Sequence, residues 1–286
     1  MRYGVVVLAL MALTQAAPQG GQQAPATEGQ FANLGSRQLW YRDTGGAGVP
    51  VVLLHARTGS NLAWERQLPA FVARGYRVIT YDRLGSGRSR LAADAAAGTA
   101  ADDLDALATQ LGLARFHLVG TAAGGIVALD YAMSYPQRVR GLVIANSIGG
   151  VQDDDYLALG RRLRPSPQFD QLPPEFREVG PSYRAGDPAG TARWIEIEHA
   201  SRPQVPGTPA QPNKNRMTFA LLESLRPPTL LITGGADLYA PPPVMRMFAA
   251  RIRGAETVVF PEAGHSSYWE EAEAFNRDVL AFLAKH

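Results

Sequence analysis

A tight strand-to-helix turn with alanine at its centre is the part of this sequence that points most directly to chemistry. The apolar run Phe116–Gly120 is expected to be a strand, and a helix is expected from Ala123. Gly120 and Gly124 flank Ala122 at two residues on either side, and so sharp a turn strains its central residue and leaves no room for neighbouring side chains. This is the G-x-S-x-G spacing, in which serine projects above a sheet to attack a carbonyl and the next helix N-terminus stabilises negative charge.

Ala122 has no atom that can attack a carbonyl, so the chain as written is expected to lack covalent catalysis. No other G-x-S-x-G stretch occurs, and Gly85-Ser-Gly87 lacks the spacing. We favour a native serine replaced by alanine, because the rest of the machinery looks intact. Two alternatives stay open: a natural alanine in a non-catalytic or non-nucleophilic protein, and a native aspartate.

An acid and a base follow two later predicted strands. Asp237 comes just after the strand 229–233, and His265 follows the strand 256–260 directly behind Gly264. The chain order nucleophile, acid, base is the order found in hydrolytic sites whose serine lies on a G-x-S-x-G turn. His265 would carry the proton and Asp237 would hold its tautomer. Taken singly, each could be an ordinary turn aspartate or loop histidine.

An oxyanion needs N–H donors, and two backbone positions are expected to supply them. One is Ala123, directly after the turn residue. The other is Arg57, in the loop that follows the strand ending at His55. The side chains of His55 and Arg57 are also substrate-binding candidates. The alternative for Arg57 is an arginine that simply lies on the surface.

Strands alternate with helices along most of the chain, which predicts an α/β protein with a mostly parallel, doubly wound sheet. Strands are expected at 38–42, 49–55, 77–81, 116–120, 139–145, 229–233 and 256–260, and helices at 63–74, 102–111, 123–135, 244–251 and 270–284. The core is therefore expected over 31–146 and 228–286.

The stretch 147–227 interrupts this rhythm and predicts an inserted, mainly helical cap. It is rich in proline and arginine and holds no strand of comparable strength. The segment Trp194–His199 is expected to be helical, with Trp194 and His199 as substrate-binding candidates. The alternative is a solvated helix packed through Trp194 and Ile197.

The N-terminus has the pattern of a secretory signal peptide over residues 1–17. Arg2 precedes the nine-residue apolar run Val5–Leu13, and small residues follow at Ala16 and Ala17. The run is shorter than the roughly 20 residues that a membrane span needs. Residues 18–30 are expected to be a flexible linker, and the mature protein to be secreted or periplasmic. An uncleaved, membrane-proximal tail is the alternative.

The composition of the chain argues against several classes of binding partner. The 286 residues carry a formal net charge of only +2, and no run of like charge favours nucleic acid or an anionic membrane. Cysteine is absent, and the five histidines lack ligand spacing, so we expect neither a metal site nor a cofactor. A small-molecule ester is the expected partner; no oligomeric state is predicted.

Together these motifs resemble the α/β-hydrolase superfamily, most of all its capped esterase, perhydrolase and C–C hydrolase branch. The resemblance runs from about Phe31 to the C-terminus and rests on these segments: 55–60, 81–89, 118–125, 234–237 and 264–265. It implies an α/β-hydrolase fold and a Ser-His-Asp acyl-enzyme mechanism on a small to medium-sized ester or lactone, a macrocyclic ester included. C–C bond hydrolysis, or binding without catalysis, are the alternatives. The chain departs from the family at Ala56, where glycine is usual, and at Ala122; Asp82 is expected to be structural.

Overall fold

The computed structural model describes residues 1, 28–163 and 166–286. The predicted signal peptide, and the predicted linker up to residue 27, lie outside these described residues except for Met1. Within the described ranges, no helix combines the length and the apolar character that crossing a bilayer would require.

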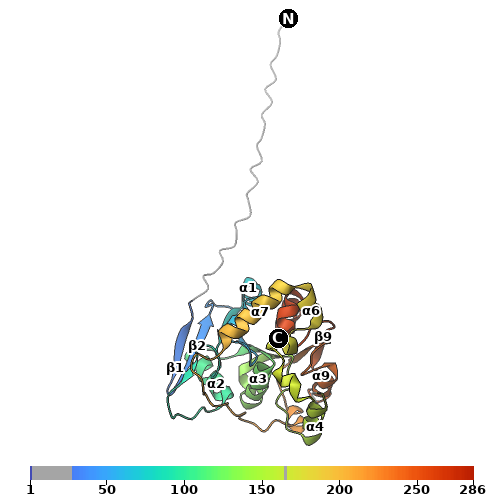
Figure 1. Ribbon diagram of the computed structural model, residues 1–286. Coiled ribbons are helices and arrows are strands. Elements are labelled where there is room, and N and C mark those ends of the chain that lie inside the picture. The colour runs from blue at the N-terminus through green and yellow to red at the C-terminus, as the bar shows by residue number, and fades with distance from the viewer. Residues whose placement is uncertain (2–27, 164–165) are drawn as a thin grey trace.

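A single mixed sheet of nine strands runs through the described part of the chain (Figure 1). Its order is β1-β2-β4-β3-β6-β7-β8-β9, and β5 pairs with β2. The pairs from β4 to β9 are parallel, whereas β1, β2 and β5 pair antiparallel. The strands span Gln30–Leu34 (β1), Arg37–Asp43 (β2), Pro50–Leu54 (β3), Arg77–Tyr81 (β4), Arg90–Leu91 (β5), Phe116–Thr121 (β6), Val139–Ala145 (β7), Thr229–Gly234 (β8) and Glu256–Phe260 (β9).

Helices cover both faces of the sheet, which is why its central strands are apolar without alternation. Val51 and Leu53 of β3 pack into one core cluster, whereas Val52 and Leu54 pack into the other. The first cluster includes residues of α1 (Leu68–Ala73) and α11 (Ala272–Leu283). The second includes residues of α2 (Ala100–Gln110), α3 (Ala123–Ser134) and α9 (Pro242–Ala249). The doubly wound arrangement follows from this division.

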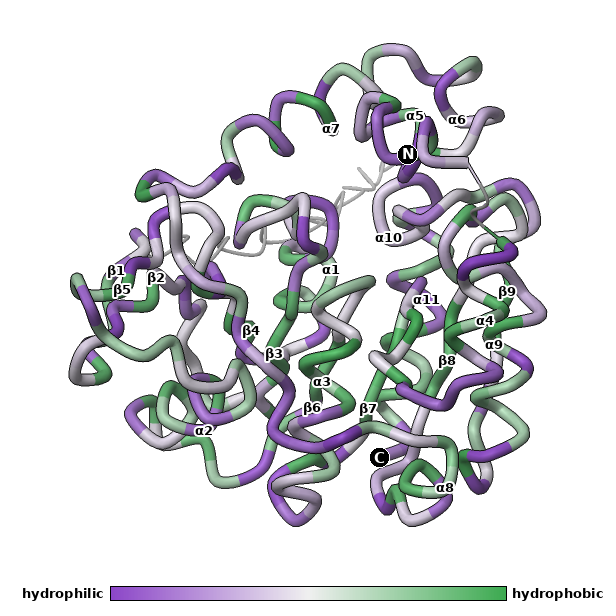
Figure 2. The backbone as a smooth tube through the Cα atoms, turned by 60° about the horizontal axis from the view of Figure 1, so that its bottom comes forward, coloured by the Kyte–Doolittle hydropathy of each residue, from purple (hydrophilic) through white to green (hydrophobic). Residues whose placement is uncertain are grey.

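Between β7 and β8 the described residues form helices and loops and no strand. The helices are α4 (Asp154–Leu163), α5 (Pro174–Glu178), α6 (Pro181–Gly186), α7 (Pro188–Ser201) and α8 (Phe219–Leu222). The rings of Tyr156, Phe219 and Phe248 pack mutually edge to face, so α4 and α8 attach to the core through α9. In Figure 2, α5, α6 and α7 instead arch over one end of the sheet.

Several predicted elements have different limits. The helix expected over 63–74 is a short 3-10 helix, Asn61–Trp64, followed by α1, because Pro69 removes an N–H that a continuous helix needs. The helix expected over 270–284 is divided into α10 (Ser267–Glu270) and α11. β1 and β5 were not predicted, and β1 starts at Gln30, the last residue of the predicted linker.

Candidate active site

The turn between β6 and α3 holds Ala122 in a strained backbone conformation, with φ +50° and ψ −117°. A Cβ atom at Gly120 would lie 2.4 Å from the carbonyl oxygen of Gly124. A Cβ atom at Gly124 would lie 2.1 Å from that of Leu54. The two glycines therefore let strand and helix approach closely enough to raise the side chain of residue 122 above the sheet edge.

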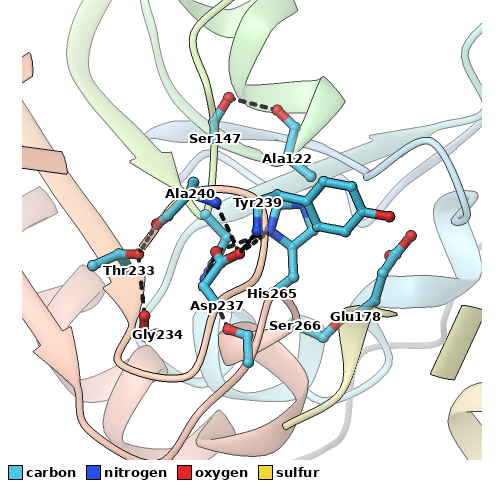
Figure 3. Close-up of polar contacts among 12 residues, drawn as sticks. Ala122, Ser147, Glu178, Thr233, Gly234, Asp237, Tyr239, Ala240, His265 and Ser266 are labelled. Carbon is cyan, nitrogen blue, oxygen red and sulfur yellow. Dashed lines mark hydrogen bonds and ion pairs between the residues drawn. The ribbon is translucent and has the colours of Figure 1, made fainter. Parts of the chain in front are cut away.

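His265 and Asp237 form a buried pair beside this turn. The imidazole Nδ1 lies 2.9 Å from each carboxylate oxygen of Asp237. Because Asp237 accepts this hydrogen bond, the proton resides on Nδ1, and Nε2 is the nitrogen able to take a proton from a nucleophile. The ring of Tyr239 packs against the imidazole at a centroid distance of 4.5 Å, with the two ring planes tilted by 40° (Figure 3).

Asp237 is held as an anion. Burial opposes its charge, but the charge and hydrogen bond of His265, together with hydrogen bonds from the Ala240 N–H and the Asn146 amide, outweigh burial and lower its pKa. Tyr239 N also donates to Oδ1 at 2.7 Å. An ionised, oriented carboxylate is what the imidazolium of an acid–base step needs.

Ala122 and His265 line one cavity of about 730 Å³. Its walls come from the strand ends of the core and from the segment between β7 and β8. The lining residues are Ala56, Arg57, Thr58, Gly85, Ala122, Ala123, Ile126, Asn146, Ile148, Asp170, Arg177, Glu178, Glu198, Ser201, Arg202, Pro203, Tyr239 and His265. A volume in this range is typical of sites for small organic ligands.

The two expected oxyanion donors reach the same cavity. Ala123 is the first residue of α3, so its N–H has no carbonyl partner within the helix, and the residue lines the cavity. Arg57 follows β3 and also lines the cavity. The structure thus brings Ala122, Ala123, Arg57 and His265 to the same cavity, with Asp237 hydrogen-bonded to the histidine.

The placement of three substrate-binding candidates has to be corrected, because His55, Trp194 and His199 do not line this cavity. His55 is fully buried; its Nε2 accepts from Arg83 N at 3.0 Å, so its Nδ1 donates to Ala56 O. Burial also lowers its pKa well below 6.5. Neutral His55 therefore joins the loop after β3 to the loop after β4.

The two candidates on α7 have other surroundings. Trp194 is buried, and its indole N–H donates to Ser266 Oγ at 3.2 Å, so it packs against the loop that carries His265. The side chain of His199 is 60% exposed and lies beside Glu198. The alternative expected from the sequence, a helix packed through Trp194, describes α7 better.

Asp82 has the structural role expected for it. Its carboxylate accepts hydrogen bonds from the backbone N–H groups of Asn61 and Arg88, at 2.7 and 2.9 Å. It therefore ties the turn after β4 to the 3-10 helix that follows the Arg57 loop.

Three polar residues of the site were not found from the sequence. Asn146, at positive φ after β7, donates to Asp237 Oδ2 and to Gly264 O, at 3.0 Å each. Glu178 is a buried carboxylate in the cavity wall. Glu270 accepts from the N–H groups of Gly264, Ser266 and Gly180 and so fastens the histidine loop to the segment after α5.

The described residues contain no group of three histidine or carboxylate side chains placed to hold a metal ion.

The chain matches the family described as Alpha/beta hydrolase family over residues 51–278, which is most of its length. The chain belongs to the alpha/beta hydrolase family.

The chain is similar to two curated proteins and to one solved structure that differ in their named activities. The chain is 31% identical to a 2-hydroxy-6-oxononadienedioate/2-hydroxy-6-oxononatrienedioate hydrolase of Paraburkholderia xenovorans, over 87% of this chain and 92% of that protein. It is 31% identical to the dihydrolipoyllysine-residue acetyltransferase component of the acetoin cleaving system of Pseudomonas putida, over 93% of this chain and 72% of that protein. A thermophilic esterase from Thermogutta terrifontis superposes with a TM-score of 0.70 at 26% identity, covering 91% of this chain and 99% of the esterase.

Proposed function

We propose that this site hydrolyses a small to medium-sized carboxylic ester or lactone through an acyl-enzyme, and that serine is the native residue at position 122. The observation that carries the proposal is that Ala122 and His265 line the same cavity, with the Asp237 carboxylate 2.9 Å from the imidazole Nδ1. An alanine side chain carries no nucleophilic atom that an adjacent acid–base pair could activate. The Thermogutta terrifontis esterase supports the ester class.

The residues divide the work as follows. A serine oxygen at 122 attacks the carbonyl carbon while His265 Nε2 takes its proton, and the N–H groups of Ala123 and Arg57 stabilise the oxyanion. His265 then gives the proton to the departing alcohol oxygen. A water, deprotonated by His265, then attacks the acyl carbon. The bond between that carbon and the serine oxygen breaks, the acid leaves, and His265 returns the proton to the serine oxygen. With Ala122 the first bond cannot form, and the chain is left to bind its substrate.

The test is pre-steady-state kinetics of the Ala122→Ser variant with p-nitrophenyl acetate, butyrate and octanoate. We expect a burst of about one nitrophenolate per active site with at least one ester. The same variant carrying His265→Ala is the control and should give none. A missing burst at every acyl length, in a variant shown to be folded, would contradict the proposal.

Hydrolysis of a C–C bond is a second candidate. It is favoured by the Paraburkholderia relative, whose name gives 2-hydroxy-6-oxononadienedioate, a keto acid, as its substrate. The two reactions use the same triad, so activity on the esters must be compared with activity on a vinylogous diketone acid. Cleavage of the latter alone would favour the second candidate.

Export through the predicted signal peptide stays a prediction, since those residues lie outside the described ones.

A further inference from the structure

Glu178 is a buried carboxylate in the cavity that the reaction above does not use. It ends α5, is 7% exposed, and lines the cavity together with Ala122 and His265. Figure 3 shows it on the other side of His265 from Asp237. A charged group left in such a place costs free energy unless hydrogen bonds satisfy it.

Only half of that carboxylate is satisfied by the protein. Thr58 Oγ1 donates to Oε2 at 2.7 Å, and no hydrogen bond from the described residues reaches Oε1. Burial raises the pKa of Glu178, although electrostatic interactions with His265 and Arg177 and the hydrogen bond from Thr58 act against it. The second oxygen therefore has the capacity to accept a hydrogen bond from a bound molecule.

The carboxylate and the backbone close to it are both held in place. Thr58 directly follows Arg57, so the hydrogen bond ties Glu178 to the predicted oxyanion loop. Two residues on, Gly180 N donates to Glu270 Oε2 at 2.8 Å, and a Cβ atom at Gly180 would lie 2.8 Å from Gly264 N. Glu178 is thus a preorganised acceptor in the cavity that Ala122 and His265 also line, and its side chain is not free to turn away.

We propose that Glu178 binds a hydroxyl group of the substrate, close to the ester carbonyl. A neutral hydroxyl suits the site better than an ammonium, because the Arg177 guanidinium already interacts electrostatically with this carboxylate and would repel a second cation. The proposal rests on the ester class proposed above and narrows it to hydroxy esters.

The test is calorimetric titration of the chain with Ala122, which cannot turn the ligand over. The probes are methyl mandelate, as each enantiomer, and methyl phenylacetate, which differs only by the 2-hydroxyl. We expect one mandelate enantiomer to bind at least about tenfold more tightly, the ratio that one hydrogen bond to a charged group provides.

Two variants assign the effect. Glu178→Gln should reduce the ratio to near one, whereas Glu175→Gln, an equal charge change on the same helix outside the cavity lining, should keep it. Equal affinities for the two esters, no binding of either, or a ratio unchanged by Glu178→Gln would each overturn the proposal. Because no turnover is needed, its outcome is independent of the burst experiment.

Discussion

Replacing Glu270 by glutamine should change the pH dependence of stability in a direction that the structure dictates. Burial raises the pKa of Glu270 from 4.5 to about 7, although N–H groups of Gly264, Gly180 and Ser266 donate to it; the charge of Asp237 adds to the rise. Between pH 4.5 and 7 the unfolded chain releases this proton while the folded chain keeps it. Stability therefore falls as pH rises through this window.

The size of the effect follows from the shift. A rise from 4.5 to about 7 corresponds to about 3 kcal/mol, at 1.36 kcal/mol per pKa unit. Glutamine does not titrate. The free energy of unfolding of the chain with Glu270 minus that of Glu270→Gln should therefore decrease by about this amount from pH 4.5 to 7.5.

Urea unfolding followed by tryptophan fluorescence at several pH values measures the difference directly. Glu271→Gln, a change of the exposed neighbouring glutamate, is the matched control and should alter the free energy of unfolding by no more than about 0.5 kcal/mol at any pH. A difference for Glu270→Gln that stays constant across the range, or that grows with pH, would refute the reasoning.

Three further substitutions test the turn and the acid. In the Ala122→Ser background, Asp237→Asn should lower kcat about 10³- to 10⁴-fold in the steady-state ester assay, because the histidine tautomer is no longer held; a loss below tenfold would contradict its role. Gly124→Ala places a Cβ atom 2.1 Å from a backbone oxygen and should cost more than about 4 kcal/mol in urea unfolding, whereas Gly186→Ala meets open space and should be close to neutral. Asn146→Leu removes the hydrogen bonds that the side-chain amide donates to the Asp237 carboxylate and to Gly264 O, and should destabilise the fold by about 2–3 kcal/mol. An unchanged urea midpoint would argue against a stabilising role for these hydrogen bonds.

The features predictable from the sequence are those with a local cause. The strands 77–81, 139–145 and 256–260 have the predicted limits, because short apolar or β-branched runs between turn signals leave few alternatives. The turn at Ala122 was predictable because so tight a turn has no room for a Cβ atom two residues before or after its centre, and glycine occupies both positions. Both kinds of signal lie within a few residues of the feature they predict.

The features that escaped prediction depend on contacts between distant segments. Glu178 and Glu270 are ordinary glutamates in sequence, and their burial follows from the close approach of Gly180 and Gly264. His55 ends a predicted strand, but nothing local shows that its ring turns inward to Arg83 instead of toward the cavity. The edge strands β1 and β5 are short or mostly half-exposed, so their residues lack the continuous apolar run that marks the centre of the sheet.

The central claim is that position 122 lies where His265 can activate a nucleophile. Its most direct test is labelling of the Ala122→Ser variant with diisopropyl fluorophosphate, followed by intact and peptide mass spectrometry. The account predicts a single phosphoryl adduct on the peptide that contains position 122, absent from the chain with Ala122 and strongly slowed by His265→Ala. An adduct at another residue, or labelling at 122 whose rate does not depend on His265, would contradict it.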